Sequence, residues 1–210
     1  MPGILMVPNW MGPTENSLKK AKEIEGDEYL VMMIDMYGTD VRPMNADEAG
    51  QASSVVRGDR SLMRERATKA LAEFISAGTS LKLDTDRIAA IGFCFGGGVV
   101  LELGRSGADL DAIVTFHGDL MSPTLETDAG KTKAKVLVLH GADDPYVTQS
   151  DVTVFMDAMR KTDVDWQLTQ FSHTVHSFTD PTADSEGARY NPLSAARAFQ
   201  AMHRLFEEVW

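Results

Sequence analysis

The sequence predicts an α/β fold in which helices cover both faces of a mostly parallel sheet. Short apolar runs alternate with longer amphipathic segments along the chain. Most of these runs are apolar at nearly every position, which is typical of strands that are buried on both faces. One of them, Ile88–Phe93, ends in a glycine-rich turn that leads directly into a helical pattern. Together these three observations indicate strands and helices that alternate within one unit.

Six apolar runs are expected to be the strands of this sheet. They are Ile4–Val7, Tyr29–Ile34, Ile88–Phe93, Ala112–Phe116, Val136–Leu139 and Trp166–Phe171. The last run alternates between apolar and polar residues, which is the pattern of a strand at the edge of a sheet.

Helical spacing of apolar residues marks the segments between the strands. The expected helices run from about Thr14 to Ile24, from Arg60 to Ala77, from Gly98 to Leu103, from Ser150 to Met159 and from Asn191 to Phe206. Two polar stretches, Gly38–Asp59 and Phe116–Lys133, have weak periodicity. We expect both to be loops or caps near the carboxyl ends of strands, where open α/β sheets place their sites.

Length and charge limit what the chain can be. The 210 residues suit a single domain, residues 1–210, and neither a linker nor a repeat divides them. A net charge of −11 disfavours a nucleic-acid partner. No apolar run reaches the roughly 20 residues that cross a bilayer, and the chain begins without a basic leader. A lone cysteine cannot form an internal disulfide. We therefore expect a cytoplasmic protein that does not bind membranes.

That cysteine, Cys94, lies in the segment Gly92–Gly97, which reads GFCFGG. A strand that turns into a helix through Gly-x-Cys-x-Gly has the layout of a nucleophile elbow, with cysteine where serine is commoner. Glycines two positions before and after the nucleophile keep neighbouring chain clear of the tight turn. The pattern predicts that Cys94 is a nucleophile and not an inert buried thiol.

A nucleophile of this kind needs a base and a group that orients the base, in the chain order nucleophile, acid, histidine. The acid is expected in the loop after Val136–Leu139, where Asp144 and Asp143 are the two candidates and the spacing Gly-x-x-Asp-x-x-Val favours Asp144. The histidine is expected beyond the last strand, where His176 is favoured over His173. The other three histidines, His117, His140 and His203, are expected to be structural.

Negative charge that develops on a substrate carbonyl needs hydrogen-bond donors. The backbone N–H of Phe95 is one candidate because it opens the helix after the elbow. The second is expected in the loop after the first strand, and we favour the N–H of Trp10. Asn9, Trp10 and Tyr37 are the candidate substrate-binding residues. Arg57, Arg60 and Arg64 could reach an anionic group, although a water-facing helix surface is the more usual place for such residues.

With these residues assembled, the chain resembles the dienelactone hydrolase family of α/β-hydrolases from about residue 3 to its end. The Gly92–Gly97 elbow, the surroundings of Asp144 and His176, and the segment Ile34–Gly38 carry the resemblance. It implies a triad of Cys94, Asp144 and His176 and an oxyanion hole formed by the N–H groups of Trp10 and Phe95. It also implies action on small esters or lactones without a metal or organic cofactor.

Three departures from the family pattern bear on the substrate. The chain starts directly at the strand that should follow an antiparallel pair, so we expect an α/β-hydrolase fold without that pair. Asn9 stands where enzymes acting on dienelactone carry a glutamate, and Thr179-Asp180 stands where they carry an arginine that holds the substrate carboxylate. These differences favour a neutral or differently held ester.

The sequence therefore predicts a hydrolase that cleaves small esters or lactones through a thioester acyl-enzyme. Its expected partner is a small-molecule substrate, and it is expected to act as a monomer or homodimer. The alternative is a non-catalytic module of the same fold that binds a ligand or uses Cys94 as a redox-sensing thiol.

Overall fold

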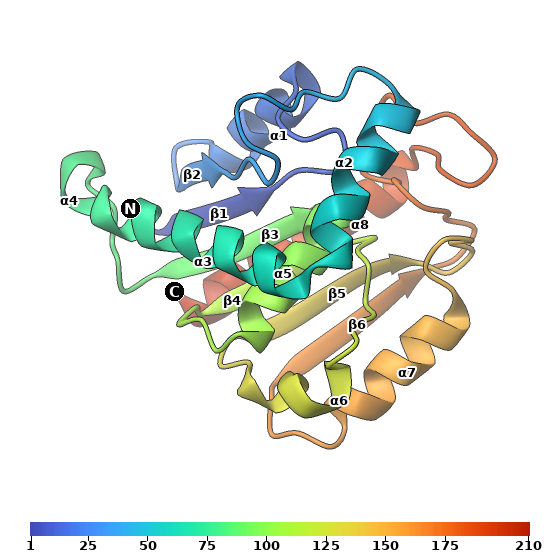
Figure 1. The fold of residues 1–210 in the computed structure, drawn as a ribbon. Helices are drawn as coiled ribbons and strands as arrows, with labels where there is room; N and C mark the ends of the chain where they lie inside the picture. The colour runs from blue at the N-terminus through green and yellow to red at the C-terminus, as the bar shows by residue number, and fades with distance from the viewer.

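The computed structural model describes residues 1–210, and its centre is a sheet of six strands that are all parallel (Figure 1). The strands are β1 (Gly3–Val7), β2 (Leu30–Met33), β3 (Ile88–Phe93), β4 (Ala112–Phe116), β5 (Lys135–Gly141) and β6 (Trp166–Phe171). Their order across the sheet is β2-β1-β3-β4-β5-β6. This confirms the predicted fold class, and β6 lies at an edge as its alternating sequence predicts.

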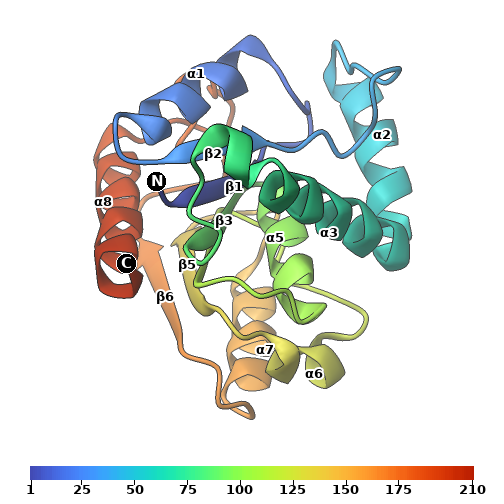
Figure 2. The ribbon, with the colours of Figure 1, turned by 90° about the vertical axis from the view of Figure 1, so that its left-hand side faces the viewer.

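Helices cover both faces of the sheet (Figure 2). They are α1 (Glu15–Glu25), α2 (Ala46–Gly58), α3 (Arg60–Ser76), α4 (Gly78–Leu81), α5 (Phe95–Arg105), α6 (Leu125–Asp128), α7 (Gln149–Met159) and α8 (Pro192–Val209), with a 3-10 turn at Ala129–Lys131. Helices α1 and α8 pack on one face, and α3, α5 and α7 pack on the other. Neighbouring residues of β1 show the two layers, because Ile4 faces the first core and Leu5 the second.

One expectation about the helices was wrong. The segment Gly38–Asp59, expected as a loop, contains the 13-residue helix α2. Asn45 caps this helix by accepting a hydrogen bond from the N–H of Glu48 at 3.0 Å. Its buried face consists of Ala49, Ser53 and Val56. Two of these residues are small or polar, so the buried stripe leaves little trace in a hydrophobicity pattern. The second expected loop, Phe116–Lys133, contains the short helix α6 and the 3-10 turn.

The loops that matter for function leave the carboxyl ends of the strands. Because all six strands are parallel, the segments after β1, β3, β4, β5 and β6 start at the same edge of the sheet (Figure 1). That edge holds the elbow, both acid candidates and both histidine candidates. No helix is long and apolar enough to cross a membrane.

Candidate active site

Cys94 lies in the turn between β3 and α5, as the elbow pattern predicts. Its backbone is in a left-handed conformation, with φ 53° and ψ −117°, which an L-residue rarely adopts. The Cys94 N–H donates to the carbonyl of Phe116 at 3.0 Å and ties the turn to β4. The thiol is held at the top of the sheet, only partly buried, at the start of helix α5.

The glycines of the elbow are required by close backbone contacts. A Cβ atom on Gly92 would overlap the backbone of Gly96 and would lie 2.7 Å from the backbone nitrogen of Gly97. A Cβ atom on Gly96 would overlap the carbonyl groups of Val7 and Pro8 at the end of β1. Since these obstacles are backbone atoms, they cannot rotate away. Glycine at both positions therefore allows the turn between β3 and α5 to pack against the end of β1.

The structure brings Asp144 to His176. The Nδ1 atom of His176 and Oδ2 of Asp144 are 2.7 Å apart, and both side chains are buried. The other carboxylate oxygen, Oδ1, accepts the N–H groups of Tyr146 at 2.9 Å and Val147 at 3.0 Å. Asp143 and His173 are exposed and take no part in this pair. Asp144 is thus fixed by its own loop and in turn fixes the imidazole ring.

The Cys94 thiol and His176 stabilise each other's charged forms. Burial alone would raise the pKa of the thiol, but the charge of His176, a hydrogen bond from it, the charge of Arg57 and the N–H of Phe95 together lower that pKa. Burial alone would lower the pKa of His176, but Cys94 and Asp144 together raise it to about 10. This arrangement favours the ion pair of a thiolate with an imidazolium over the two neutral groups.

A cavity of about 480 Å³ opens above the thiol. Its lining residues are Asn9, Trp10, Arg57, Cys94, Asp119, Tyr146, Val147, His176, Ser177, Ser185 and Ala188. Tyr146, which is 63% exposed, contacts the ring of His176 edge-to-face with centroids 5.4 Å apart. The cavity is therefore walled by the loops after β1, β4, β5 and β6 and by α2.

Three residues expected to contact substrate fall in two different places. Asn9 and Trp10 line the cavity. The side-chain oxygen of Asn9 accepts the N–H of Met11 at 3.0 Å, whereas the N–H of Trp10 makes no hydrogen bond within the protein. Tyr37 lies behind the cavity wall, where it is buried, donates to the carbonyl of Trp10 at 2.7 Å and stacks on Phe95. Tyr37 thus supports the Trp10 loop from behind.

Arg57, one of the three arginines considered for an anionic group, lines the cavity, and so does Asp119, which was not among the predicted site residues. The buried Nε of Arg57 has no hydrogen-bond partner, and its guanidinium lies 5.5 Å from the centre of the Phe95 ring. Arg60 and Arg64 do not line the cavity: Arg60 faces Asp119 at 3.8 Å, and Arg64 binds Glu102 at 2.7 Å. The position of Asp119 just after β4 is a signal that sequence reasoning could have used. Arg57 gives no such signal, because it comes from α2.

No group of three or more His, Cys, Asp or Glu side chains is arranged to hold a metal ion.

A parallel sheet with a nucleophile elbow at its carboxyl edge, and an acid and a histidine from the loops that follow, defines an α/β-hydrolase fold. The chain belongs to the dienelactone hydrolase family, whose family model matches residues 1–210.

Solved structures agree with this assignment. A protein described as m3DLH is 39% identical, with a TM-score of 0.91 over 100% of this chain and 87% of the other. A dienelactone hydrolase-like promiscuous phosphotriesterase, P91, from metagenomic libraries is 38% identical, with a TM-score of 0.90 and the same coverage.

An uncharacterized protein of Caenorhabditis elegans, K02A2.1, is 28% identical over 136 residues, which are 61% of this chain and 84% of that protein.

Proposed function

We propose that the protein hydrolyses small carboxylic esters or lactones through a covalent thioester on Cys94. The observation that carries this proposal is the buried 2.7 Å contact between His176 and Asp144 beside a thiol whose pKa is lowered. An inert buried cysteine would have a raised pKa and no imidazole in contact with it. The family assignment supports hydrolase chemistry in general.

In the first half of the proposed reaction, the Cys94 thiolate attacks the substrate carbonyl carbon and the carbonyl π electrons move onto oxygen. In this proposal the N–H groups of Phe95 and Trp10 donate to that oxyanion, and the absence of an intramolecular partner for the N–H of Trp10 supports its part in it. The intermediate collapses as the bond to the leaving oxygen breaks. His176 gives its Nε2 proton to the leaving alkoxide, which departs as the alcohol.

In the second half, neutral His176 takes a proton from water as the water oxygen attacks the thioester carbonyl. The carbon–sulfur bond then breaks, and the released electron pair restores the Cys94 thiolate beside the His176 imidazolium. Throughout, Asp144 accepts a hydrogen bond from the Nδ1–H of His176 without taking the proton, which keeps Nε2 directed toward the reacting atoms. The products are a carboxylic acid and an alcohol, or a hydroxy acid from a lactone.

The cavity limits the substrate that we propose. A volume of about 480 Å³ suits a small acyl group with a modest leaving alcohol. Apart from the thiol–imidazole pair, Arg57 and Asp119 are the charged residues of its wall, and Asp119 faces Arg60 at 3.8 Å. The proposal of a neutral or differently held ester therefore rests on the departures at Asn9 and Asp180, and Arg57 is the cation available for an anionic substituent.

The test is a screen of p-nitrophenyl esters of two to eight carbons with intact-mass detection of acylated protein. We expect turnover and an acyl adduct in the wild type, and neither in Cys94→Ala. His203→Ala is a matched control because this histidine packs on Tyr29, away from the cavity. Equal background hydrolysis by all three proteins, without an adduct, would instead support the non-catalytic ligand-binding or redox module.

A second candidate activity is phosphotriester hydrolysis, favoured by the 38% identity with P91 over the whole chain. The same thiolate would attack phosphorus and displace an alkoxide or phenoxide, leaving a phosphorylated cysteine that water then cleaves. A p-nitrophenyl dialkyl phosphate, assayed beside the carboxylic esters, tests this activity. Release of p-nitrophenol that Cys94→Ala abolishes would support it.

A further inference from the structure

A second histidine, His117, lies against the proposed catalytic histidine. It follows Phe116 at the end of β4, is buried, and has a left-handed φ of 40°. Its ring lies edge-to-face with the ring of His176, with centroids 5.0 Å apart and planes at 65°. His117 does not line the catalytic cavity. It therefore contacts His176 without belonging to the wall that substrate would touch.

A short polar chain connects His117 to helix α1. The ammonium group of Lys20, on α1, donates to Oγ1 of buried Thr179 over 3.4 Å, and that oxygen lies 2.9 Å from Nε2 of His117. An ammonium group can only donate, so the Thr179 oxygen accepts from Lys20, and Nε2 of His117 is the one acceptor in the protein within reach of the hydroxyl proton. Donation of that proton to Nε2 satisfies the hydroxyl and places the ring proton of His117 on Nδ1.

The outer end of this chain is accessible. Lys20 and Thr179 line a second cavity, of about 350 Å³, between α1 and α8. The Lys20 nitrogen lies 4.3 Å from the centre of the Phe93 ring, and it makes no ion pair with a carboxylate. Burial lowers the pKa of Lys20 to about 8 despite the nearby charges of Asp180 and Glu23.

His117 is kept neutral although an imidazolium is expected next to it. Burial is the largest cause of a pKa well below the usual histidine value, and the charges of His176, Lys20 and His140, which are the titratable groups facing it, lower it further. The chain adds a directional reason. A proton on Nε2 would leave the Thr179 hydroxyl proton without an acceptor in the protein, and the buried Nδ1 has no partner to share a second positive charge.

We propose that His117 is a positioning residue for His176, held neutral and in its Nδ1–H tautomer by Thr179 and Lys20. A neutral His117 ring packs against the ring of His176 without repelling the positive charge of that ring. It also leaves His176 as the only imidazole at the site that can carry the catalytic proton. This inference rests on the proposed function for the role of His176, but the tautomer of His117 can be measured without any substrate.

The test compares Thr179→Val, which removes the hydroxyl at nearly constant shape, with Thr179→Ser, which keeps it. Nitrogen-15 NMR of the histidine rings reports the tautomer and protonation of His117. In the wild type and in Thr179→Ser we expect Nε2 to be the unprotonated nitrogen down to the lowest pH at which the protein is folded. In Thr179→Val we expect a mixture of tautomers and protonation at higher pH, because the neutral form loses a hydrogen bond.

Ester kinetics supply the second readout. We expect kcat of Thr179→Val to fall by about three- to tenfold at unchanged KM, because His117 contacts His176 and not the substrate cavity. Lys20→Met should shift the His117 titration in the same direction, and Lys20→Arg should keep it near wild type. If Thr179→Val does not fold, the comparison of Lys20→Met with Lys20→Arg provides the test.

The proposal is overturned if the wild-type ring is protonated on Nε2, or if Thr179→Val and Lys20→Met leave the tautomer of His117 unchanged. It is also overturned if the tautomer changes while kcat stays at the wild-type value. If no ester is turned over, the proposed function fails by itself, and the rate of Cys94 alkylation at fixed pH replaces kcat as the measure of the thiol–imidazole pair.

Discussion

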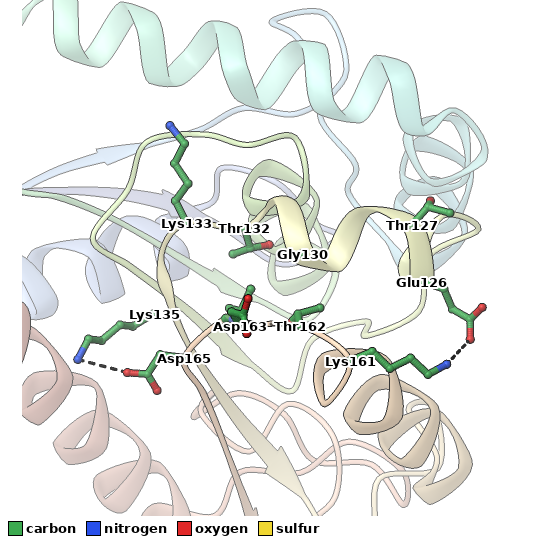
Figure 3. A pocket seen from close by; sticks show the side chains of 11 residues that line it. Glu126, Thr127, Gly130, Thr132, Lys133, Lys135, Lys161, Thr162, Asp163 and Asp165 are labelled. Carbon is green, nitrogen blue, oxygen red and sulfur yellow. Dashed lines mark hydrogen bonds and ion pairs between the residues drawn. The ribbon is translucent and has the colours of Figure 1, made fainter.

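Charged side chains gather at both ends of the sheet, and the two groups differ in how they are held. At the amino ends of β5 and β6, a groove of about 630 Å³ carries Lys135, Lys161 and their acidic partners at the surface (Figure 3). Lys161 pairs with Glu126 at 3.1 Å, and both side chains are largely exposed. At the carboxyl ends, Asp144 and His176 are 2.7 Å apart and buried, beside a thiol with a lowered pKa.

The difference between the groove and the catalytic cavity shows that the size of a cavity and the presence of charged residues do not by themselves identify an active site. The groove is the larger of the two cavities, yet its ion pairs lie at the surface, where water and salt screen them and each contributes little to stability. In the smaller cavity, burial makes each charge depend on its partner, so the pKa values of the partners move. Three variants can sharpen or break this comparison.

The largest effect is expected for Asp144→Asn. An amide leaves the geometry in place but cannot stabilise the imidazolium or hold its tautomer, so ester turnover should fall by about 10³- to 10⁴-fold. The matched variant is Asp143→Asn, which changes an exposed neighbour and should leave kcat/KM near wild type. Steady-state kinetics on a p-nitrophenyl ester measure both. The reverse result would make Asp143 the acid.

The second variant asks whether burial of a charge is enough to indicate function. Glu102 is buried on α5 and binds Arg105 at 2.8 Å and Arg64 at 2.7 Å, away from the catalytic cavity. Glu102→Ala should lower the free energy of unfolding by about 3 kcal/mol, because it leaves the buried Arg105 charge unpaired.

The control for this variant is Glu126→Ala, which breaks the exposed pair with Lys161 and should cost less than about 1 kcal/mol. Urea unfolding measures both changes. Equal values would show that the two kinds of ion pair do not differ in stability. At urea concentrations below its unfolding transition, Glu102→Ala should retain the ester turnover of the wild type.

The smallest effect is expected in the pH dependence of Cys94 alkylation. The lowered thiol pKa keeps the thiolate present as pH falls below about 8.5, the ordinary value for cysteine, and it is lost only as pH falls through the lowered pKa. His176→Ala removes the main opposing charge and leaves the effect of burial, so the midpoint should rise above that of the wild type. At pH 7 iodoacetamide should then react more slowly than it does with the wild type. An unchanged midpoint would contradict the thiolate–imidazolium pair.

What could be predicted from sequence depended on how far apart the relevant residues lie along the chain. The elbow around Cys94 is local, since its glycines and the strand–helix change lie within a few residues. The positions of Asp144 and His176 followed from chain order, because parallel strands bring the ends of successive segments to one edge. The spacing around Asp144 pointed to the aspartate that the structure places against His176.

Other residues needed three-dimensional information. Helix α2 was missed because its buried face is made of small and polar residues. As a result Arg57 was assigned to a solvated surface, although its buried Nε lies at the cavity. His117 was expected to be only structural, and nothing in its local sequence indicates that its ring meets His176. Contacts of this kind depend on side chains from separate strands and loops.

Five residues other than glycine have left-handed backbone angles, and four of them, Cys94, His117, His173 and Ser177, follow the carboxyl ends of strands. Glycine would relieve about 1 kcal/mol or more at each position, so selection for thermal stability and selection for turnover oppose each other at this edge. At Cys94 the exchange would remove the nucleophile. At exposed His173 it would touch neither the thiol nor its partners, which makes this loop position a place where the protein can be stabilised without a loss of chemistry.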